Sequence, residues 1–265
     1  MNVITTENLA EAFDQAARRY DLMAGLNPGY HRHLRSAAES LVEALPKAPG
    51  PKSSGSRTSG DPRGSAIVDL GCGSGASTRA LQRSLEAAGL APEVIGIDAS
   101  AGMVGQARAK SWPDGIRFEL GMAEELVSAR EQWGLSEPRR GVFASYLFRN
   151  VGERDKVLAE VHDLLIDDGV LVVQEYSVAG SRRAAVIWSI VCWLVVIPLS
   201  WLTQRKTRLY RYLWRSVLTF DSVQGFVDRL YGAGFVDVEV RSVPGWQRGI
   251  LHTFRARKPA LPDLS

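Results

Sequence analysis

The chain has 265 residues, of which 45% are hydrophobic and 23% charged, a composition typical of a globular protein that buries a sizeable core. A net charge of +3 is too small to indicate nucleic-acid binding, so no nucleic acid is expected as a partner. Two cysteines and four scattered histidines offer neither a disulfide framework nor a metal-ligand spacing, so no metal site is expected.

The N-terminal part, residues 1–46, predicts two helices, at 6–20 and 30–45. Thr6 is a suitable N-cap for the first helix. These helices either pack on the outside of the domain or form a lid that keeps water from a bound cofactor, and the sequence leaves both alternatives open. Residues 47–64 are rich in glycine, proline, serine and charge, so we expect a flexible linker there.

Residues 65–180 alternate short apolar runs with helical patterns, which predicts a mainly parallel sheet with helices between its strands. In such sheets, ligands bind beyond the carboxyl ends of the strands. The expected strands are 66–70, 94–97, 116–120, 142–147 and 170–175, and the expected helices are 77–88, 101–110 and 153–165.

The first expected strand runs into a turn that contains Gly71, Gly73 and Gly75, and a helix follows. Glycines let a ligand lie against the main chain, and the start of a helix presents free N–H groups. The second strand ends in Asp98, whose carboxylate is placed to hold the two hydroxyls of a ribose. We therefore expect a nucleoside-like ligand here. The spacing differs from the G-x-G-x-x-G pattern of dinucleotide-binding proteins, which argues against an NAD-dependent enzyme.

Residues 184–204 contain no charged side chain, and a membrane-spanning helix needs about 20 such residues. Pro198, two serines and three tryptophans weaken that interpretation, and basic residues flank the segment at 182–183 and 205–211. Three alternatives stay open: an amphipathic segment that contacts the membrane surface and lines an apolar substrate tunnel, a buried core helix, or a true membrane span.

Residues 181–218 are therefore interpreted as an apolar and basic insertion into the sheet domain. The domain resumes at 219–258 with a helix and two further strands, at 235–240 and 252–257, which we expect to be edge strands. These strands bring the expected number to seven, and a tail follows at 259–265.

Two motifs resemble those of class I S-adenosylmethionine (SAM) methyltransferases: the run from Asp69 to Gly75 resembles their first motif, and Gly96–Ile97–Asp98 their second. Further segments narrow the resemblance to the UbiE-type C-methyltransferases of menaquinone and ubiquinone biosynthesis, and it covers nearly the whole chain apart from the linker. These segments are Tyr20–Asp21–Leu22–Met23, Gly29–Tyr30–His31–Arg32, Phe148–Arg149–Asn150–Val151, Glu175–Tyr176–Ser177, Tyr210–Arg211–Tyr212–Leu213, Ala233–Gly234–Phe235 and Gly249–Ile250–Leu251–His252.

The resemblance implies an α/β, Rossmann-like class I methyltransferase fold: a mainly parallel seven-stranded sheet with N-terminal lid helices and an apolar helical insertion before the last strands. It implies SAM as the cofactor and a lipophilic, polyprenylated hydroquinone as the acceptor, methylated on carbon. The cofactor-binding residues that it implies are Tyr20, Asp69, Gly71, Gly73, Gly75, Asp98, Ala99, Met103, Met122 and Ala123. The catalytic residues that it implies are Arg149, Asn150, Asp21 and Tyr146.

For this chemistry, Arg149 is expected to stabilise the phenolate that forms when a ring hydroxyl loses its proton, with a surface ion pair as its structural alternative. Asn150 is expected to orient a ring oxygen or a water. Relatives commonly carry Asp-Ala where this chain has Met122–Ala123, so adenine recognition is expected from backbone groups and apolar contacts. The general base is left open among Asp21, His31, Tyr146 and Glu175.

Two other functions stay open: methyl transfer to another lipophilic or aromatic small molecule, such as a lipid or a natural product, and binding without turnover. The sequence does not predict the oligomeric state. The first residues lack a basic stretch followed by an apolar core, so no secretory signal is visible. We expect a cytoplasmic protein, peripheral on the inner face of the membrane, which it contacts through 184–204 and the flanking basic residues.

Overall fold

The computed structural model describes residues 9–14, 25, 27, 29–46, 67–90, 93–204 and 207–260, without the side chains of 202–204. The expected linker at 47–64 lies outside the described residues, as do Tyr20 and Asp21 of the N-terminal motif.

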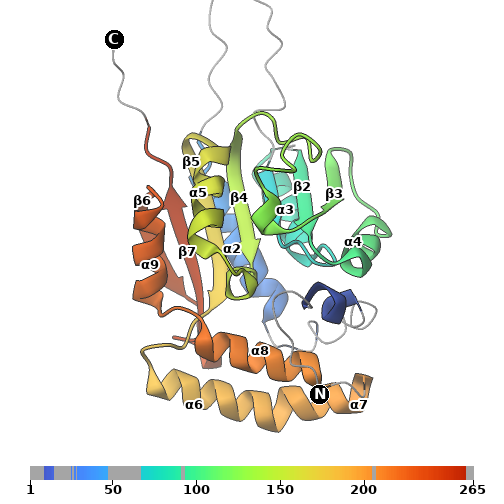
Figure 1. Ribbon diagram of the computed structural model, residues 1–265, viewed down its shortest axis with the longest axis vertical. Coiled ribbons are helices and arrows are strands. Elements are labelled where there is room, and N and C mark those ends of the chain that lie inside the picture. The colour runs from blue at the N-terminus through green and yellow to red at the C-terminus, as the bar shows by residue number, and fades with distance from the viewer. Residues whose placement is uncertain are drawn as a thin grey trace, which may run out of the picture.

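Seven strands form one sheet in the order β3-β2-β1-β4-β5-β7-β6 (Figure 1). Strands β1 to β5 pair in parallel, and β7 pairs antiparallel with both β5 and β6. The mainly parallel, seven-stranded sheet is therefore confirmed. The strands are β1 Ile67–Leu70, β2 Val94–Asp98, β3 Ile116–Leu120, β4 Arg139–Ser145, β5 Leu165–Tyr176, β6 Val236–Ser242 and β7 Leu251–Arg257.

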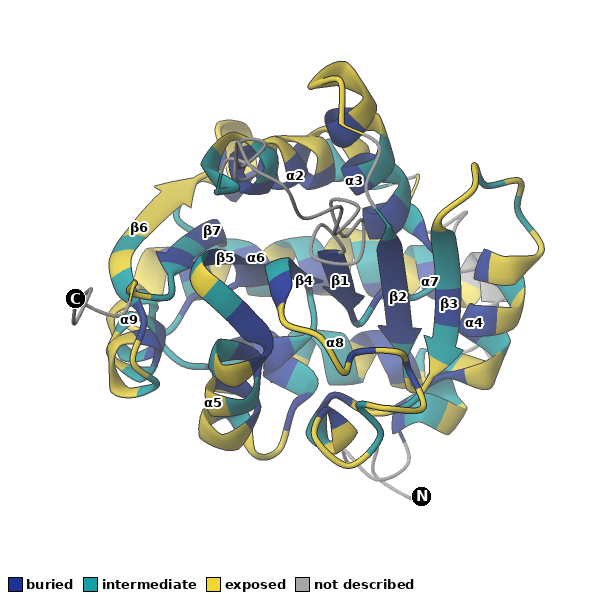
Figure 2. Cartoon of the chain, turned by 90° about the horizontal axis from the view of Figure 1, so that it is seen from above, coloured by how far each residue is buried: buried dark blue, intermediate teal, exposed yellow. Residues whose placement is uncertain are grey.

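Helices cover both faces of the sheet (Figure 2). Successive side chains of a strand point to opposite faces, so on β1 Ile67 packs with one layer of helices and Val68 with the other. Burial on both faces explains why the central parallel strands read as continuous apolar runs. One layer holds α2 (Tyr30–Ala44) and α3 (Ala76–Ala87), the other holds α5 (Arg154–Leu164) and α9 (Val223–Gly232), and α4 (Ala101–Arg108) packs beside β3.

The insertion between β5 and α9 lies beyond the carboxyl ends of the parallel strands (Figure 1). It begins with α6 (Arg182–Val191), continues through a π-helical turn at Cys192–Val196, and ends its first layer with α7 (Ile197–Gln204). Helix α8 (Arg208–Thr219) then returns between this layer and the sheet. The apolar segment is thus helical throughout, while α8 is a helix that the sequence analysis did not predict.

Two expectations about the strands are wrong. The strand at 252–257 is not an edge strand, because β7 lies between β5 and β6. Of these two strands, β6 is the one at the edge of the sheet, and its charged side chains, such as Asp237 and Glu239, suit that position. The strand expected at 142–147 ends at Ser145, because Tyr146 takes a positive φ of 59° and leaves the extended conformation.

Candidate active site

The glycine turn and Asp98 face each other at the carboxyl end of the sheet. The N–H of Gly73 donates to Oδ2 of Asp98 at 2.8 Å, and the N–H of Ser100 donates to Oδ1 at 2.9 Å. Gly73 has a φ of 55° and open space where a Cβ would stand, so its backbone is directly approachable. Burial raises the pKa of Asp98, and the two N–H donors oppose that rise. The carboxylate is thus held against the turn.

Asp69 and Gly75 lie at the turn without lining the cavity described below. Asp69 is fully buried and accepts hydrogen bonds from the hydroxyls of Ser77 at 2.7 Å and Thr78 at 2.6 Å. Burial raises its pKa to about 7, against the effect of those two bonds. Gly75 has a φ of 91°, and a Cβ there would meet the Trp112 ring at 2.8 Å. Both residues therefore support the conformation of the turn from the side that does not line the cavity.

One cavity brings together most residues of the two predicted sets. Its walls come from the glycine turn, the ends of β2, β3 and β4, the start of α4 and residues 9–14. Of the predicted cofactor residues, Gly71, Gly73, Asp98, Ala99, Met103, Met122 and Ala123 line it, and of the predicted catalytic residues, Tyr146, Arg149 and Asn150 do.

Tyr146 is held in an aromatic row on the wall of this cavity. Its ring stacks between Tyr30, at 5.7 Å between centroids, and Tyr176, at 5.2 Å, and Tyr176 in turn contacts Trp188 of α6. Its positive φ is the kind of strained backbone that clusters at functional sites. Burial, followed by the neighbouring Tyr176, Tyr30 and Glu175, raises the pKa of Tyr146 well above its usual value. The phenol therefore keeps its proton and is suited to donate a hydrogen bond.

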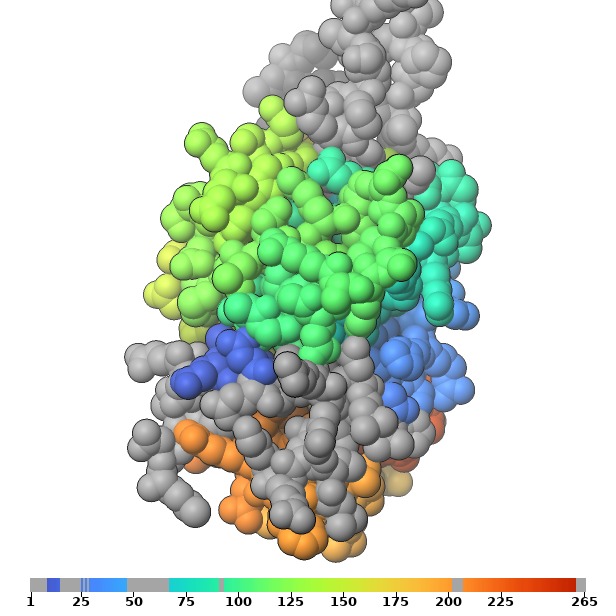
Figure 3. All heavy atoms as spheres, turned by 90° about the vertical axis from the view of Figure 1, so that its right-hand side faces the viewer, coloured from blue at the N-terminus to red at the C-terminus, as the bar shows by residue number. Residues whose placement is uncertain are grey.

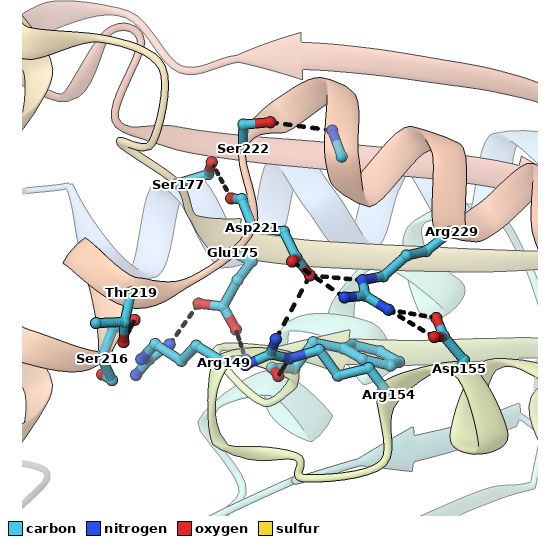
Figure 4. A network of polar contacts seen from close by, with 12 residues as sticks. Arg149, Arg154, Asp155, Glu175, Ser177, Ser216, Thr219, Asp221, Ser222 and Arg229 are labelled. Carbon is cyan, nitrogen blue, oxygen red and sulfur yellow. Dashed lines mark hydrogen bonds and ion pairs between the residues drawn. The ribbon is translucent and has the colours of Figure 1, made fainter.

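Arg149 forms a buried ion pair with Glu175, at the ends of neighbouring strands β4 and β5 (Figure 4). Both side chains are almost inaccessible, at 6% and 0% exposure, so the surface ion pair considered from sequence is instead an internal one. The N–H groups of Arg149 and Tyr176 also donate to the Glu175 carboxylate, at 3.2 and 3.0 Å. These contacts fix the guanidinium at the cavity wall, because a buried charge needs a partner.

Asn150 links the cavity wall to the insertion. Its Nδ2 donates to the carbonyl of Tyr146 at 3.2 Å, and its Oδ1 accepts from the hydroxyl of Tyr212 on α8, also at 3.2 Å. Tyr212 is not among the site residues predicted from sequence. Tyr212 belongs to the family-like segment Tyr210–Leu213, but that resemblance implied no role for it and no contact with Asn150.

Of the four candidate bases, the structure places only Tyr146 on the cavity wall within its described residues. Asp21 and Tyr20 lie outside the described residues, so their predicted roles stay predictions. His31 is exposed and lines a separate groove between α2 and α3. Glu175 is enclosed behind Arg149 and does not line the cavity.

Residues 9–14 are helical and close one side of the cavity, where Leu9, Ala10 and Phe13 line it. Figure 3 shows them, in dark blue, between the green surface of the sheet domain and the orange surface of the insertion. Leu9 packs in one apolar cluster with Leu209 of α8, and the Asp14 carboxylate accepts hydrogen bonds from Ser100 and Gly102. This placement supports the lid alternative for this helix.

The predicted tunnel from the insertion is not seen here. Among the described residues, none of 182–219 lines the cavity, and the insertion reaches it through Leu9 and Asn150 instead.

The residues of this cavity fit an adenosyl ligand that carries a carboxylate. Each Asp98 oxygen accepts one N–H and keeps acceptor capacity for a ribose hydroxyl. Helix α3 begins at Ala76 on the cavity lining, and the first N–H groups of a helix suit an anion. Met103 and Ala123 are buried and offer apolar surface to a base.

Comparisons with known proteins agree with this fit. Residues 1–258 match the ubiE/COQ5 methyltransferase family. A demethylmenaquinone methyltransferase from Beutenbergia cavernae is 28% identical over 97% of this chain and 94% of that protein. The ubiquinone/menaquinone biosynthesis C-methyltransferase UbiE from Desulfotalea psychrophila is 29% identical over 86% of this chain and 82% of that protein. A SAM-dependent methyltransferase structure from Thermotoga maritima has a TM-score of 0.56 at 16% identity, covering 95% of this chain and 99% of that one.

The structural likeness shows the Rossmann-like fold of class I methyltransferases, which the sequence motifs predicted. The family match spans almost the entire chain, including both ends of the sheet and the insertion. The chain therefore belongs to the ubiE/COQ5 methyltransferase family, and it is a methyltransferase that uses SAM.

Proposed function

We propose that the enzyme methylates a ring carbon of a lipophilic hydroquinone, the type of acceptor that the names of its relatives indicate for them. One observation carries the proposal: Asp98 and the pair Arg149 and Asn150 line the same cavity. A nucleoside held by Asp98 and an acceptor held by Arg149 would thus share one enclosed space, which methyl transfer requires.

The cavity wall also suits a flat aromatic ring. Tyr30 and Tyr146 line it, and Leu9 and Phe13 add apolar surface. Aromatic and apolar side chains with few polar groups favour a planar, lipophilic acceptor over a charged one.

Bound SAM supplies an electrophilic methyl group, and the chain's own residues prepare the acceptor. The Arg149 guanidinium stabilises the negative charge that develops on a ring oxygen as its proton leaves, because a fixed cation contributes most where charge develops. The neutral Tyr146 phenol donates a hydrogen bond in the same region, and its high pKa argues against a role as base. Asn150, fixed by Tyr212, orients the ring oxygen.

We also propose that the insertion contacts the membrane surface. Its outer face exposes Val186, Ile190, Trp193, Leu194, Val195 and Trp201, of which Leu194 is 72% exposed. Exposed basic residues border this face: Arg182 and Arg183 precede it, and Arg208, Arg211 and Arg215 lie at helical spacing on α8. An apolar face with a basic border suits an anionic lipid surface.

The alternative of a membrane span rests on length and composition. The helix Arg182–Trp201, of 20 residues, is long and apolar enough to cross a bilayer, and 28% of its apolar 18-residue window is buried in the protein. Packing against α8 through Trp188, whose indole N–H donates to the carbonyl of Trp214 at 3.2 Å, favours contact along the surface. A peripheral enzyme on the inner face of the membrane could meet a lipophilic acceptor there.

The decisive cellular experiment is mass spectrometry of the quinones after deletion of the gene. We expect a quinone that lacks one ring methyl group to accumulate, and the wild-type gene to restore the normal quinone. An unchanged quinone profile would reject the proposed acceptor. If the purified protein then released S-adenosylhomocysteine with another lipophilic acceptor, the alternative substrate class would hold. If it released none, binding without turnover would hold.

A further inference from the structure

A second groove lies beside the active-site cavity, between α2 and α3, and its charged lining is basic. The basic residues that line it are His31, Arg35, Arg79, Arg83 and Lys110. No acidic residue lines it among the described parts of the chain. Tyr30 and Ala76 line both this groove and the active-site cavity, so the two spaces are neighbours.

Four of the five basic side chains come from two packed helices, and Lys110 follows α4. His31 and Arg35 are four residues apart on α2, and Arg79 and Arg83 are four residues apart on α3. The two helices pack together through their apolar residues. Side chains four residues apart on a helix are neighbours, and like charges there destabilise it. The acids Glu39 and Glu86 follow on these helices outside the groove lining, and neither forms an ion pair with Arg35 or Arg83.

Two of the cations, Arg79 and Lys110, are oriented by contacts with neighbouring described residues. The Arg79 guanidinium lies 3.9 Å from the Trp112 ring centroid and donates to Oε1 of Gln82 at 2.6 Å and to the carbonyl of Ser111 at 2.5 Å. The Lys110 ammonium donates to the carbonyl of Ser74 at 2.7 Å. Such contacts orient Arg79 and Lys110 and lower the entropy that a ligand would lose on binding them.

Arg35 and Arg83 are exposed, and neither forms a hydrogen bond or ion pair with a described residue. Their guanidinium groups are therefore available to a ligand. A guanidinium group can donate two parallel hydrogen bonds to two oxygens of one phosphate, and it keeps its positive charge at any physiological pH.

We propose that this groove binds a ligand with two adjacent phosphate groups. Three arginines and Lys110 together carry a positive charge similar in magnitude to the negative charge of a diphosphate. Arg79 and Arg83 distribute part of this positive charge along about one turn of α3. Ala76, the first residue of α3, lies at the end of the groove that meets the active-site cavity. The ligand is either a free diphosphate or a lipid headgroup with two phosphates. This site goes beyond methyl transfer, which needs no phosphate.

The test is isothermal titration of the full-length protein with inorganic pyrophosphate, with S-adenosylhomocysteine present to fill the active site. The double variant Arg35→Gln/Arg83→Gln should lose affinity by at least about tenfold, because two charged hydrogen-bond donors to the phosphates are removed. The matched control is Arg241→Gln/Arg248→Gln, which removes two exposed arginines from another part of the chain. Sedimentation with cardiolipin-containing vesicles, compared with phosphatidylcholine alone, repeats the comparison for a lipid headgroup.

Each outcome decides. Pyrophosphate binding that is lost only in the Arg35 and Arg83 variant supports a free diphosphate ligand. Cardiolipin binding that is weakened only in that variant supports a headgroup, since any contact through the insertion is common to all proteins compared. Equal affinity for orthophosphate and pyrophosphate, or no difference between the two double variants, would overturn the proposal. Methyl transfer should be the same in all three proteins, so failure of the groove and failure of the active site are distinguishable.

Discussion

Asp69 and Asp98 follow similar apolar strands, yet their carboxylates have different surroundings. Asp98 faces the cavity with two N–H donors and remaining acceptor capacity, while Asp69 is enclosed below the turn with two hydroxyl donors. The family resemblance placed both in the cofactor site. Asp98 is therefore accessible to a ligand, whereas Asp69 stabilises the start of α3 through Ser77 and Thr78.

Asp98→Asn should weaken SAM binding by about tenfold or more, because the ribose hydroxyls lose a charged acceptor. The N–H groups of Gly73 and Ser100 also lose one of the two carboxylate oxygens that accept from them. Isothermal titration with SAM measures the effect. Asp114→Asn, an exposed carboxylate away from the cavity lining, serves as the control and should bind like wild type. If Asp98→Asn also binds like wild type, the ribose assignment is wrong.

Asp69 should make the stability of the protein depend on pH. Its pKa is about 7 in the folded chain, above the ordinary 3.8, so between these values the folded chain holds a proton that the unfolded chain has lost. Its contribution to the free energy of unfolding therefore falls as the pH rises from about 4 to about 7. Asp69→Asn keeps an oxygen for Ser77 and Thr78 and should flatten this fall. Urea denaturation across that pH range measures it; equal slopes for both proteins would count against the buried, protonated carboxyl.

Arg149 should be needed for turnover and not for SAM binding. Because its removal alone leaves the Glu175 charge buried, the informative variant is Arg149→Met/Glu175→Gln, which removes both charges together. We expect SAM affinity to stay near wild type and the rate of S-adenosylhomocysteine release to fall by about 100-fold. Removing the ion pair Arg255 and Glu239 on the sheet edge is the control. An unchanged rate in the Arg149 variant would remove this residue from the mechanism.

At the scale of elements, the parallel strands are the part of the fold that sequence predicts best. Strands such as β1 and β2 are short, apolar and bounded by turn residues, so their pattern is unambiguous. The place of β7 between β5 and β6 is not encoded in any local pattern, because strand order depends on long-range pairing. Helix α8 carries a helical stripe, with Leu209, Tyr210, Ser216 and Val217 buried, but its many aromatic and basic residues obscured that period.

The residues of the candidate site also divide into those that a local motif predicts and those that depend on long-range contacts. The glycine turn and Asp98 are local motifs, so sequence located them. The pairing of Arg149 with Glu175 joins residues 26 positions apart, and it follows from the adjacency of β4 and β5, whose ends bring both side chains together. The contact of Tyr212 with Asn150 depends on where the insertion docks, which no motif specifies.

The outer face of the insertion should determine membrane binding. Leu194→Glu places a charge on the most exposed part of this face and should weaken binding to anionic vesicles by about tenfold, since burying a leucine contributes ~1.5 kcal/mol or more. The folded structure should be unaffected because the side chain is already in water. Val127→Glu changes a comparably exposed apolar residue, 58% exposed, outside the insertion and is the control. Equal vesicle binding by both variants would exclude this face.

On the scale of the whole molecule, three distant parts of the chain meet over the active-site cavity. Residues 9–14 contact the start of α4 through Asp14 and the insertion through Leu9, while α8 reaches the cavity wall through Tyr212. The ends of the strands and residues 9–14 line the cavity, and the insertion packs behind them through Leu9. In the proposed mechanism, the strand ends would hold the cofactor, and residues 9–14 would limit the access of water to the acceptor.

The central claim is that this cavity delivers a methyl group from SAM to a ring carbon. Its most direct test is a reaction of the purified enzyme with SAM labelled with ¹³C in the methyl group and a reduced quinone that lacks one ring methyl, followed by ¹³C–¹H correlation NMR of the product. We predict a labelled methyl signal typical of carbon attached to an aromatic ring. A methoxy signal, or no transfer by protein that binds SAM, would contradict it.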